Sequence, residues 1–486
     1  MPFLLGIDQG TTQTTAVVVD EHGTLVAKHS VPLPVRFPRP DWVEQDPWAI
    51  VATVRAAVAP LLDHFEIAAV GFDNQGETFL LWDAASGQPL TPAVVWQDKR
   101  AQALCTELAT TIDPGWLQQK TGLRLDTYFS APKLRFILEQ DADLRRAVEA
   151  GRARFGTTES WVIWQLTHGR VHVTDPSTAS RTLFFDLNRL QWDDELLALF
   201  GLPRVCLPDV VPSAGYVGEL NFGLARTYPL YALLVDQQAA LFGQACLEAG
   251  DMKCTFGTGT FLLMNTGSTP RLSQQGLLTT VAWQIGETVH YALDGGDFVA
   301  GAAVQWLVEN AAFLPDAAAS HPVAQQASDP DILFVPTLAG LGAPHWQPQA
   351  RGTLFGISRA TTQADIVRAT LEGIACRVYD IVKAIEQDAG YPLTRLKVDG
   401  GPAANPTLMQ LLADLLGIEI QVAAAEEATA MGVANLAGHA ALGIATTDLR
   451  QRWRAQAVYQ PALAPAERER RLARWQRALA ALRVFY

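Results

Sequence analysis

Two glycine-containing turns in the sequence combine the groups that bind phosphate. Asp8-Gln9-Gly10-Thr11-Thr12 follows one apolar run, and Gly257-Thr258-Gly259 follows another. Glycine lets backbone amides approach an anion closely, threonine hydroxyls add donors, and a carboxylate can hold hydrated Mg²⁺. Asp-x-Gly is also ordinary turn chemistry, so one such turn alone would be moderate evidence. Neither turn matches the GxxxxGK[ST] loop, and no GxGxxG opens a helix after the first strand, which excludes Walker-type and dinucleotide sites.

Two further polar segments follow apolar runs that are typical of strands. Asp236 comes directly after residues 230–235 and begins a helix, where a helix-capping aspartate is the common alternative to a functional one. A carboxylate at such a strand end can also accept a proton from an attacking hydroxyl, as phosphoryl transfer requires. Asp399-Gly400-Gly401 lies between a strand over 396–398 and a helix that begins near Asn405. This is either a plain strand-to-helix turn or a ligand site at the carboxyl end of a strand.

An α/β scaffold must position these segments. A chain of 486 residues is too long for one core, and residues 253–265 repeat the strand, Gly/Thr turn and strand of the opening, although chance similarity is the alternative. We therefore predict two domains of similar design facing one cleft, residues 1–245 and 246–486, with the boundary after a helix over 241–244. The other predicted elements are strands over 3–8, 16–20, 24–28 and 68–72, a helix over 48–65, and a C-terminal helix over 466–483 whose Arg-rich face we interpret as solvated.

The composition is that of an ordinary globular protein. The chain is 49% hydrophobic and 18% charged, with a net charge of −13. This charge disfavours nucleic acid as a partner but not ATP, because Mg²⁺, backbone amides and helix N-termini neutralise phosphates locally. The sequence has no run of about eighteen apolar residues, so it predicts no membrane span. The N-terminus lacks a signal-peptide pattern, and we therefore expect a cytoplasmic protein. The five cysteines are scattered without a CxxC pair, so we interpret them as core or surface thiols.

The chain resembles the FGGY carbohydrate kinases along nearly its whole length, and within that family its motifs look most like those of glycerol kinases. The motifs occur in the family's order and at compatible spacings, which is specific for the family and less specific for the substrate. They are GIDQGTTQTTAVVVD, DWVEQDP, TGLRLDTYFSAPKL, WVIWQLTHGRVHVTDPSTASRTLF, DQQAALFGQ, TFGTGTFLLMNTG, GLLTT, FVAGAAVQWL, GLGAPHWQPQARGTLFGISRAT, RATLEGIA, VDGGPAANPTLMQ and TAMGVANLAG.

The resemblance implies a two-domain α/β fold of the actin/hexokinase (ribonuclease H-like) type, in which ATP, Mg²⁺ and a small polyol or sugar meet in the interdomain cleft. It implies transfer of the ATP γ-phosphate to a hydroxyl, most closely of glycerol to give glycerol 3-phosphate, by a homodimer or higher homo-oligomer. By similarity, Asp236 would be the catalytic base and Asp8 would hold Mg²⁺. The other positions carried over are the phosphate contacts Thr11, Thr12 and Thr258, the nucleotide contacts Gly301, Gln305, Gly401 and Asn405, the hydroxyl ligands Glu77, Tyr128 and Gln237, and the aromatic walls Trp96 and Phe261.

The sequence departs from glycerol kinases at the acceptor site. Those enzymes usually carry an arginine in NQRE, where this chain has Gly76, and a second arginine where this chain has Thr15. Each guanidinium would contribute charge-assisted hydrogen bonds of about 1.5–3 kcal/mol. Gly76 also enlarges the pocket. A longer acceptor such as erythritol, a pentitol or a pentulose (xylulose or ribulose) is therefore an alternative to glycerol as the substrate. Other residues that bear on the site are Lys99, Arg100 and Arg124, which could compensate for the missing charge, and Asp73, which replaces a small neutral residue.

Several alternatives are weakened by particular residues. The xylulose-kinase pattern Gln-Met-His-Gly is absent, because Glu77 occupies the position of its histidine. Residues 221–233 are shorter than the loop with which regulated bacterial glycerol kinases bind a sugar bisphosphate, so we do not expect that control. An actin-fold ATPase that binds a partner protein would not need the polyol-pocket residues. A catalytically silent sugar sensor would not need Asp8, Asp236 and both Gly-Thr turns.

Overall fold

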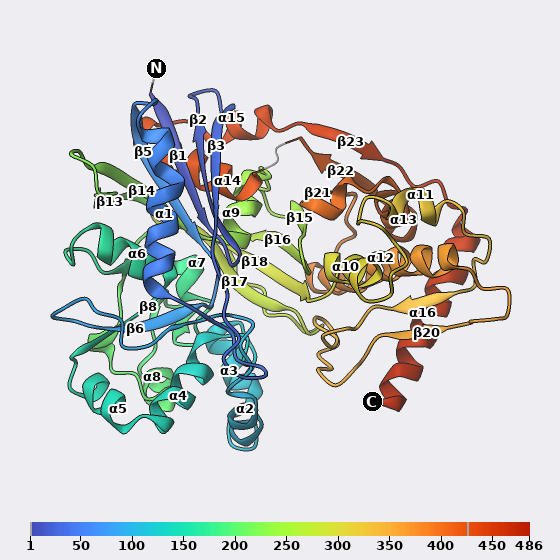
Figure 1. Ribbon diagram of the computed structural model, residues 1–486, viewed down its shortest axis with the longest axis horizontal. Helices are drawn as coiled ribbons and strands as arrows, with labels where there is room; N and C mark the ends of the chain where they lie inside the picture. Colours follow the sequence, from blue (N-terminus) through green and yellow to red (C-terminus); the bar gives the residue numbers. More distant parts are fainter. Residues whose placement is uncertain (1, 425–426) are drawn as a thin grey trace.

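The computed structural model describes residues 2–424 and 427–486, and the chain forms two lobes that share one large sheet (Figure 1). Over the described residues this sheet has 13 strands in the order β23-β22-β21-β15-β16-β18-β17-β13-β14-β5-β1-β2-β3. In the middle of the sheet, β13 (Ala214–Leu220) and β17 (Leu278–Ile285) are joined by the parallel pair of Ala214 with Ile285. The sheet is therefore continuous but weakly joined where its two halves meet.

Each half of the sheet is built in the same way, from an antiparallel meander of three strands followed by two parallel strands. In the first half these strands are β1 (Phe3–Gln9), β2 (Gln13–Val19), β3 (Leu25–Pro32), β5 (Ile67–Asn74) and β14 (Tyr228–Val235). In the second half they are β15 (Met252–Phe256), β16 (Thr260–Gly267), β18 (Thr288–Asp297), β21 (Arg395–Asp399) and β22 (Glu419–Ala423). The repeated strand, turn and strand predicted from the sequence is confirmed.

The predicted elements are present, with ends shifted by a few residues; the helix predicted over 48–65 ends three residues early, at Leu62. The remaining strands are β4 (Glu44–Gln45), β6 (Phe79–Asp83), β7 (Ala93–Val94), β8 (Ala153–Thr157), β9 (Val173–Thr174), β10 (Phe185–Asp186), β11 (Gln191–Trp192), β12 (Asp209–Val210), β19 (Leu333–Val335), β20 (Thr353–Phe355) and β23 (Ala455–Tyr459). The α-helices are α1 (Pro47–Leu62), α2 (Gln102–Leu108), α3 (Pro114–Thr121), α4 (Ser130–Gln140), α5 (Ala142–Glu149), α6 (Thr158–Leu166), α7 (Pro176–Ala179), α8 (Asp194–Phe200), α9 (Asp236–Gly243), α10 (Gly301–Glu309), α11 (Ser320–Ala324), α12 (Gln363–Ala389), α13 (Pro406–Leu416), α14 (Ala428–Leu442), α15 (Thr446–Arg452) and α16 (Pro465–Phe485).

The centre of the first half of the sheet is covered on both faces. Leu5 and Ile7 of β1 belong to a core with α1, whereas Leu4 of β1 and Ala69 of β5 belong to a core with α14. All four side chains are buried, so β1 carries a nearly continuous apolar run instead of an alternating pattern, as expected of a strand between two helical layers. The apolar N-terminal run of the sequence thus places β1 in the interior, with its carboxyl end at the cleft.

Helix α14 belongs to the C-terminal part of the chain but lies against the strands of the first half (Figure 1). Its backbone approaches so closely that a Cβ on Gly71 of β5 would collide with the carbonyl of Val433. A Cβ on Gly432 of α14 would likewise collide with the carbonyl of Ala239 in α9. Only glycine permits such an approach. The contact locks β5, α9 and α14 into one block.

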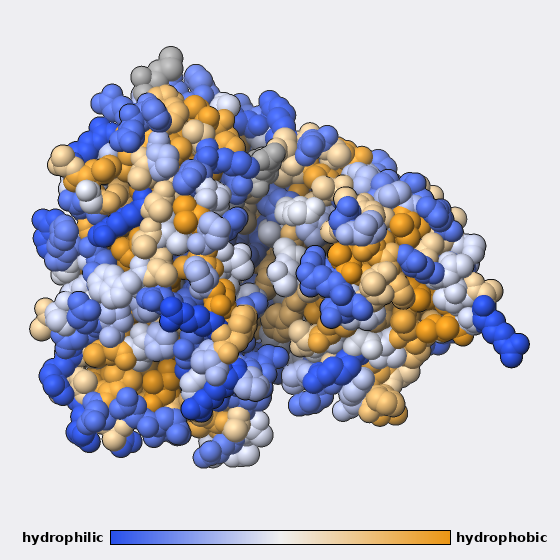
Figure 2. All heavy atoms as spheres, viewed as in Figure 1, coloured by the Kyte–Doolittle hydropathy of each residue, from blue (hydrophilic) through white to orange (hydrophobic). Residues whose placement is uncertain are grey.

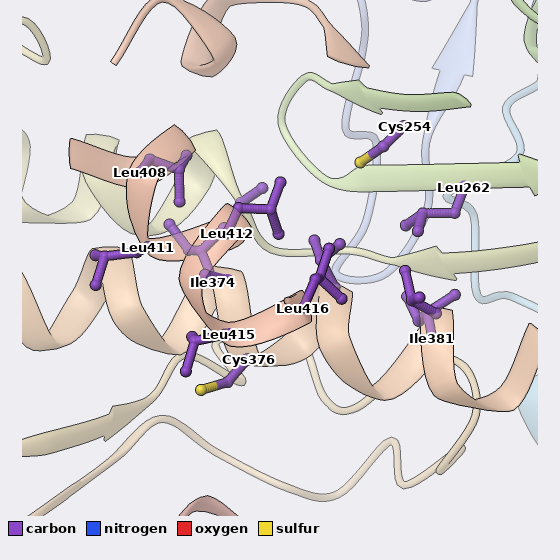
Figure 3. Close-up of a cluster of buried hydrophobic side chains, with 14 of the residues drawn as sticks. Cys254, Leu262, Ile374, Cys376, Ile381, Leu408, Leu411, Leu412, Leu415 and Leu416 are labelled. Carbon is purple, nitrogen blue, oxygen red and sulfur yellow. The ribbon is translucent and has the colours of Figure 1, made fainter. Parts of the chain in front are cut away.

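The second lobe has its own core around the long helix α12. This helix begins at a capping box formed by Thr362 and Asp365, and it ends at Gly390, whose φ of 81° suits a helix C-terminus. Figure 3 shows Ile374 and Ile381 of α12 among the buried side chains of this core. Other residues of the core in the same view are Cys254, Leu262, Cys376, Leu408, Leu411, Leu412, Leu415 and Leu416.

None of the described helices is both long and apolar enough to cross a bilayer. All five cysteines are buried and unpaired, so of the predicted core or surface thiols they are core thiols. Burial raises the pKa of the Cys254 thiol well above its usual value, which keeps it protonated and unreactive.

The C-terminal helix α16 is anchored by a buried polar contact. Trp475 is fully buried, and its Nε1 donates to Asp380 Oδ2 at 3.0 Å. The same carboxylate accepts from Arg377 Nη1 at 3.0 Å and lies 3.1 Å from His345 Nε2. Asp380 therefore ties α16 to α12, and the ring of Trp475 fills the space between them.

Trp475→Ala should lower the free energy of unfolding by roughly 3–5 kcal/mol, because it leaves a cavity in a core that cannot fully collapse. Urea denaturation of the two proteins would measure the difference. Trp475→Phe keeps most of the packing and should cost less, about 1.5–3 kcal/mol for the lost hydrogen bond to a carboxylate. Equal stability of the alanine variant and the parent would show that α16 is not part of the folded core.

Candidate active site

Three carboxylates lie at the carboxyl ends of adjacent parallel strands, where ligands of α/β proteins usually bind. Asp8 on β1 is paired in register with Asp73 on β5, and Asp73 is paired with Leu234 near the end of β14. Asp236 follows β14 directly as the first residue of α9. The N-cap position is held by Val235, so Asp236 is not the helix cap that was the alternative in the sequence. Figure 2 shows that the surface is hollowed between the two lobes.

Burial raises the pKa of all three carboxyl groups, and a hydrogen-bond contact with Asp73 opposes the rise at Asp8. Burial raises the pKa of Asp8 to about 7, and the charge of Asp236 adds to this effect. Burial also raises the pKa of Asp73 well above its usual value, with further contributions from Asp8 and Asp236. The pKa of Asp236 rises to about 6 through burial, although the Gln237 backbone N–H and the charges of Lys253 and Arg181 oppose the rise. Asp236 is therefore ionised at neutral pH but more basic than an ordinary aspartate.

Three of the predicted acceptor residues bring their aromatic rings together. The Trp96 ring stands edge to face with Tyr128 at a centroid distance of 5.7 Å and with Phe261 at 6.1 Å. Trp96 Nε1 donates to Thr11 Oγ1 at 3.0 Å, which links this wall to the first phosphate-type turn. The same turn is held from behind, because Gln45 Nε2 donates to the Thr11 carbonyl at 2.6 Å. These rings and the turn of Thr11 and Thr12 are thus one connected unit.

Glu77 is held by an arginine that the sequence analysis missed. Arg181 Nε donates to Glu77 Oε1 at 2.7 Å, and its Nη1 donates to Asp294 Oδ2 at 2.8 Å, with all three side chains buried. Burial raises the pKa of Glu77, and the charge and hydrogen bond of Arg181 oppose that rise. Glu77 itself has a φ of 56°, a costly conformation for a residue with a side chain. This backbone conformation and the ion pair fix the carboxylate toward the pocket.

Two of the residues that could have compensated for Gly76 are paired with groups other than Glu77. Arg100 pairs with Asp98 and Glu44, and Arg124 stacks on Trp346. Sequence reasoning missed Arg181 because it lies 104 residues from Glu77. The sequence signal that could have identified Arg181 is its position in the ASRT segment, directly after a buried helical turn.

A buried lysine stands behind the general-base candidate and was also missed. Lys253 Nζ donates to Gln237 Oε1 at 2.5 Å and to Thr255 Oγ1 at 3.0 Å. Burial lowers the pKa of Lys253, while the charges of Asp399 and Asp236 oppose that change. The ammonium group therefore orients Gln237 and adds positive charge beside Asp236.

The predicted nucleotide contacts line one cavity of about 960 Å³ in the second lobe. The Gly257–Thr258 turn reaches it, and its carbonyls accept from the start of α10, from Gly301 N and Ala302 N. Gly301 must be glycine, because a Cβ there would collide with the Gly257 carbonyl. Asn405 caps α13 through its Oδ1 and donates from Nδ2 to Ser320 Oγ at 2.9 Å. The predicted residues that line the cavity are Thr258, Gly301, Gln305, Gly401 and Asn405.

The duplicated α/β sheet defines a protein of two similar α/β halves, and the family match adds the class of carbohydrate kinase. The chain matches the FGGY family of carbohydrate kinases over residues 3–243 for the N-terminal domain and 252–441 for the C-terminal domain. It belongs to this family, which confirms the resemblance found in the sequence and implies the use of ATP.

Individual relatives agree with this membership. The glycerol kinase of Symbiobacterium thermophilum is 44% identical, with 98% of this chain and 97% of the relative covered. Glycerol kinase 2 of Thermotoga maritima is 42% identical, with 99% and 98% covered. The crystal structure of Plasmodium falciparum glycerol kinase with ADP superposes with a TM-score of 0.92 at 31% identity, over 99% and 98% of the two chains. A xylulose kinase of Lactobacillus acidophilus has a TM-score of 0.88 at 22% identity, with 99% of both chains covered, which supports the fold alone.

Gly257→Val should weaken ATP binding by roughly ten- to hundred-fold, the equivalent of one lost charge-assisted hydrogen bond. A Cβ at Gly257 meets open space, so the fold tolerates the side chain, which then blocks the approach of phosphate to the backbone. Calorimetric titration with a non-hydrolysable ATP analogue measures the effect, and acceptor affinity without nucleotide is the control. Unchanged nucleotide affinity would remove this turn from the phosphate site.

Proposed function

We propose that this chain transfers the γ-phosphate of ATP to a hydroxyl of glycerol and forms glycerol 3-phosphate. The observation that carries the proposal is the acceptor pocket, where Trp96, Tyr128 and Phe261 surround the carboxyl groups of Glu77 and Asp236. A small polyol offers C–H faces to rings and hydroxyls to a few fixed polar groups. Relatives named glycerol kinase match over nearly their whole length, which supports the same acceptor.

In this proposal Asp236 is the general base. It accepts the proton of the acceptor hydroxyl as the hydroxyl oxygen attacks the γ-phosphorus, and ADP departs with the electrons of the broken P–O bond. Its pKa of about 6 leaves it ionised at neutral pH and basic enough for this role. Gln237, oriented by Lys253, and Glu77, oriented by Arg181, hold the acceptor hydroxyls in place. Tyr128 completes the set of hydroxyl ligands.

The phosphates and the nucleotide occupy the opposite side of the cleft in this proposal. Closure of the lobes over both substrates would exclude water from the transfer. The phosphate contacts are Thr11, Thr12 and Thr258, and the nucleotide contacts are Gly301, Gln305, Gly401 and Asn405.

Asp8 would hold Mg²⁺, and the donor set fits this ion. The carboxyl groups of Asp8 and Asp73 are hard oxygen ligands, and no N–H or hydroxyl group of the described residues donates to either oxygen of Asp73. When bound, Mg²⁺ would neutralise charge on the transferring phosphoryl group. Within the described ranges no group of three or more His, Cys, Asp or Glu side chains could hold a metal by itself. Water and phosphate oxygens would complete the coordination, as is usual for Mg²⁺.

Three broader features belong to the same proposal. The domain boundary lies near residue 245, after α9 and before β15. The protein works in the cytoplasm and forms a homodimer or a higher homo-oligomer. These remain predictions, which limited proteolysis, cell fractionation and sedimentation respectively would test.

A longer polyol or ketose is the second candidate acceptor, and the surroundings of Gly76 favour it. Gly76 adds no side chain beside Glu77, where an arginine would otherwise occupy part of the pocket. A methyl group of Val235 fills some of this space, because a Cβ built on Gly76 would lie 3.0 Å from Val235 Cγ2. Gly76 and Val235 therefore form one unit that sets the size of the pocket.

Asp236→Asn should lower kcat by roughly two to four orders of magnitude without unfolding the protein. In the parent, kcat/KM should fall below pH about 6, because protonation of Asp236 removes the base. A coupled assay of ADP release gives both quantities, and circular dichroism checks the fold. Activity within threefold of the parent would rule out Asp236 as the base.

Acceptor choice is tested by a panel of glycerol, dihydroxyacetone, erythritol, pentitols and pentuloses. We expect Gly76→Arg combined with Val235→Ala to shift kcat/KM toward glycerol, because arginine occupies the space of an additional CHOH unit. The lost charged hydrogen bond in the parent corresponds to a roughly ten- to hundred-fold higher KM for glycerol. Gly76→Arg alone is the control, since its Cβ is crowded by Val235. A parent with strong preference for glycerol and a ratio unmoved in the double variant would show that this pair does not set specificity.

A further inference from the structure

Asp73 is the most unusual polar group of the cleft. Its side chain is 0% exposed, and no N–H or hydroxyl group of the described residues donates to either carboxyl oxygen, whose one side-chain hydrogen-bond contact is with the carboxyl group of Asp8. Buried carboxylates are normally paired with a donor or a cation, because the cost of an unpaired buried charge is high. The residue therefore requires either a proton or a positively charged ligand.

The surroundings of Asp73 narrow this choice. In the sheet register Asp8 lies directly beside it on β1, and Asp236 is close enough to repel it from the end of β14. Both neighbours are themselves carboxyl groups, and both raise its pKa. A hydrogen bond between Asp73 and Asp8 can form only if the two share a proton. Lys253 and Arg181 approach Asp236, but their own hydrogen bonds are made to Gln237 and Glu77.

We infer that Asp73 is a second cation-holding carboxylate beside Asp8, so that the cleft binds one hydrated divalent cation before either substrate arrives. The inference rests on the proposed function only for the identity of the cation, which is the Mg²⁺ that accompanies ATP. Two carboxylates, completed by water, suit Mg²⁺, which is rarely held in an all-protein cage.

The proposal has a consequence for stability. Without a cation, the buried and unpartnered charge of Asp73 destabilises the folded state, and the strands of the sheet prevent it from moving away from Asp8. A bound cation removes this cost and therefore stabilises the fold by mass action. Asp73 is thus a residue whose removal should stabilise the cation-free protein and abolish its response to cations.

The experiment uses the full chain, freed of divalent ions and without nucleotide or polyol. Free Mn²⁺ is followed by electron paramagnetic resonance during titration, and thermal unfolding is recorded with and without Mn²⁺. The parent should bind one Mn²⁺ saturably, and Asp73→Asn should bind it at least roughly tenfold more weakly. The unfolding temperature of Asp73→Asn without Mn²⁺ should equal or exceed that of the parent, and Mn²⁺ should raise it only in the parent. Asp73→Thr repeats the test if the asparagine variant does not fold.

Glu159→Gln is the matched control. Glu159 is 1% exposed in α6, outside the cleft, and its Oε2 also lacks a partner, while Oε1 accepts from Thr157 Oγ1 at 2.6 Å and from Thr174 Oγ1 at 2.7 Å. Its substitution should leave the Mn²⁺ titration unchanged. The inference is overturned if the parent shows no saturable binding at millimolar Mn²⁺, or if Asp73→Asn binds Mn²⁺ within twofold of the parent. Either result would make Asp73 an acid that holds a proton. Because no substrate is present, neither result bears on glycerol phosphorylation, which the ADP-release assay tests separately.

Discussion

The close backbone contact of α14 with β5 and α9 is the constraint on which the cleft depends. Gly71, which contacts α14, lies two residues before Asp73. The carbonyl of Ala239, which contacts Gly432 of α14, lies three residues after Asp236. A helix from the C-terminal part of the chain therefore fixes the strand end and the helix start that carry two of the three carboxylates. Since backbone meets backbone at these glycines, the carboxylates cannot separate without breaking the packing of the block. Their mutual repulsion is imposed by the fold.

This arrangement couples protonation to stability. The pKa values of Asp8 and Asp236 rise from 3.8 to about 7 and about 6, and that of Asp73 rises well above 3.8. A group whose pKa is higher in the folded state stabilises the fold when protonated. That contribution is complete below pH about 4 and is lost as the pH rises through 6–7. The proposed chemistry needs these groups ionised, so the working cleft is held in its less stable protonation state, and ligands that supply positive charge recover part of the cost.

Much of the scaffold could be predicted from the sequence because it follows from local patterns. The apolar runs of β1, β5 and β14 and the Gly-Thr turns are recorded in consecutive residues, as is the helix that begins at Asp236. The tertiary partners could not be predicted in this way. The ion pair of Arg181 with Glu77 joins residues 104 positions apart, and the contact of Val235 with Gly76 depends on how two strands lie side by side. Likewise, α14 follows the proposed boundary in sequence but packs on the first half of the sheet.

The tertiary contacts of Arg181 and Val235 change the effect expected from Gly76, which stands where glycerol kinases usually carry an arginine. Positive charge still reaches the acceptor side, but from Arg181 beneath Glu77 and from Lys253 behind Gln237. Arg181 is already bound to Glu77, and Lys253 is already bound to Gln237. Each cation therefore acts on the acceptor through the side chain that it orients. An arginine at position 76 would instead contact the acceptor directly. Recognition then depends on the fixed Glu77 carboxylate and on the shape left by Gly76 and the methyl group of Val235. A pocket that discriminates by shape separates acceptors differing by one CHOH unit only modestly, by about 1–3 kcal/mol. In the proposed acceptor site we therefore expect discrimination between glycerol and longer polyols to depend on packing around Val235 more than on charge.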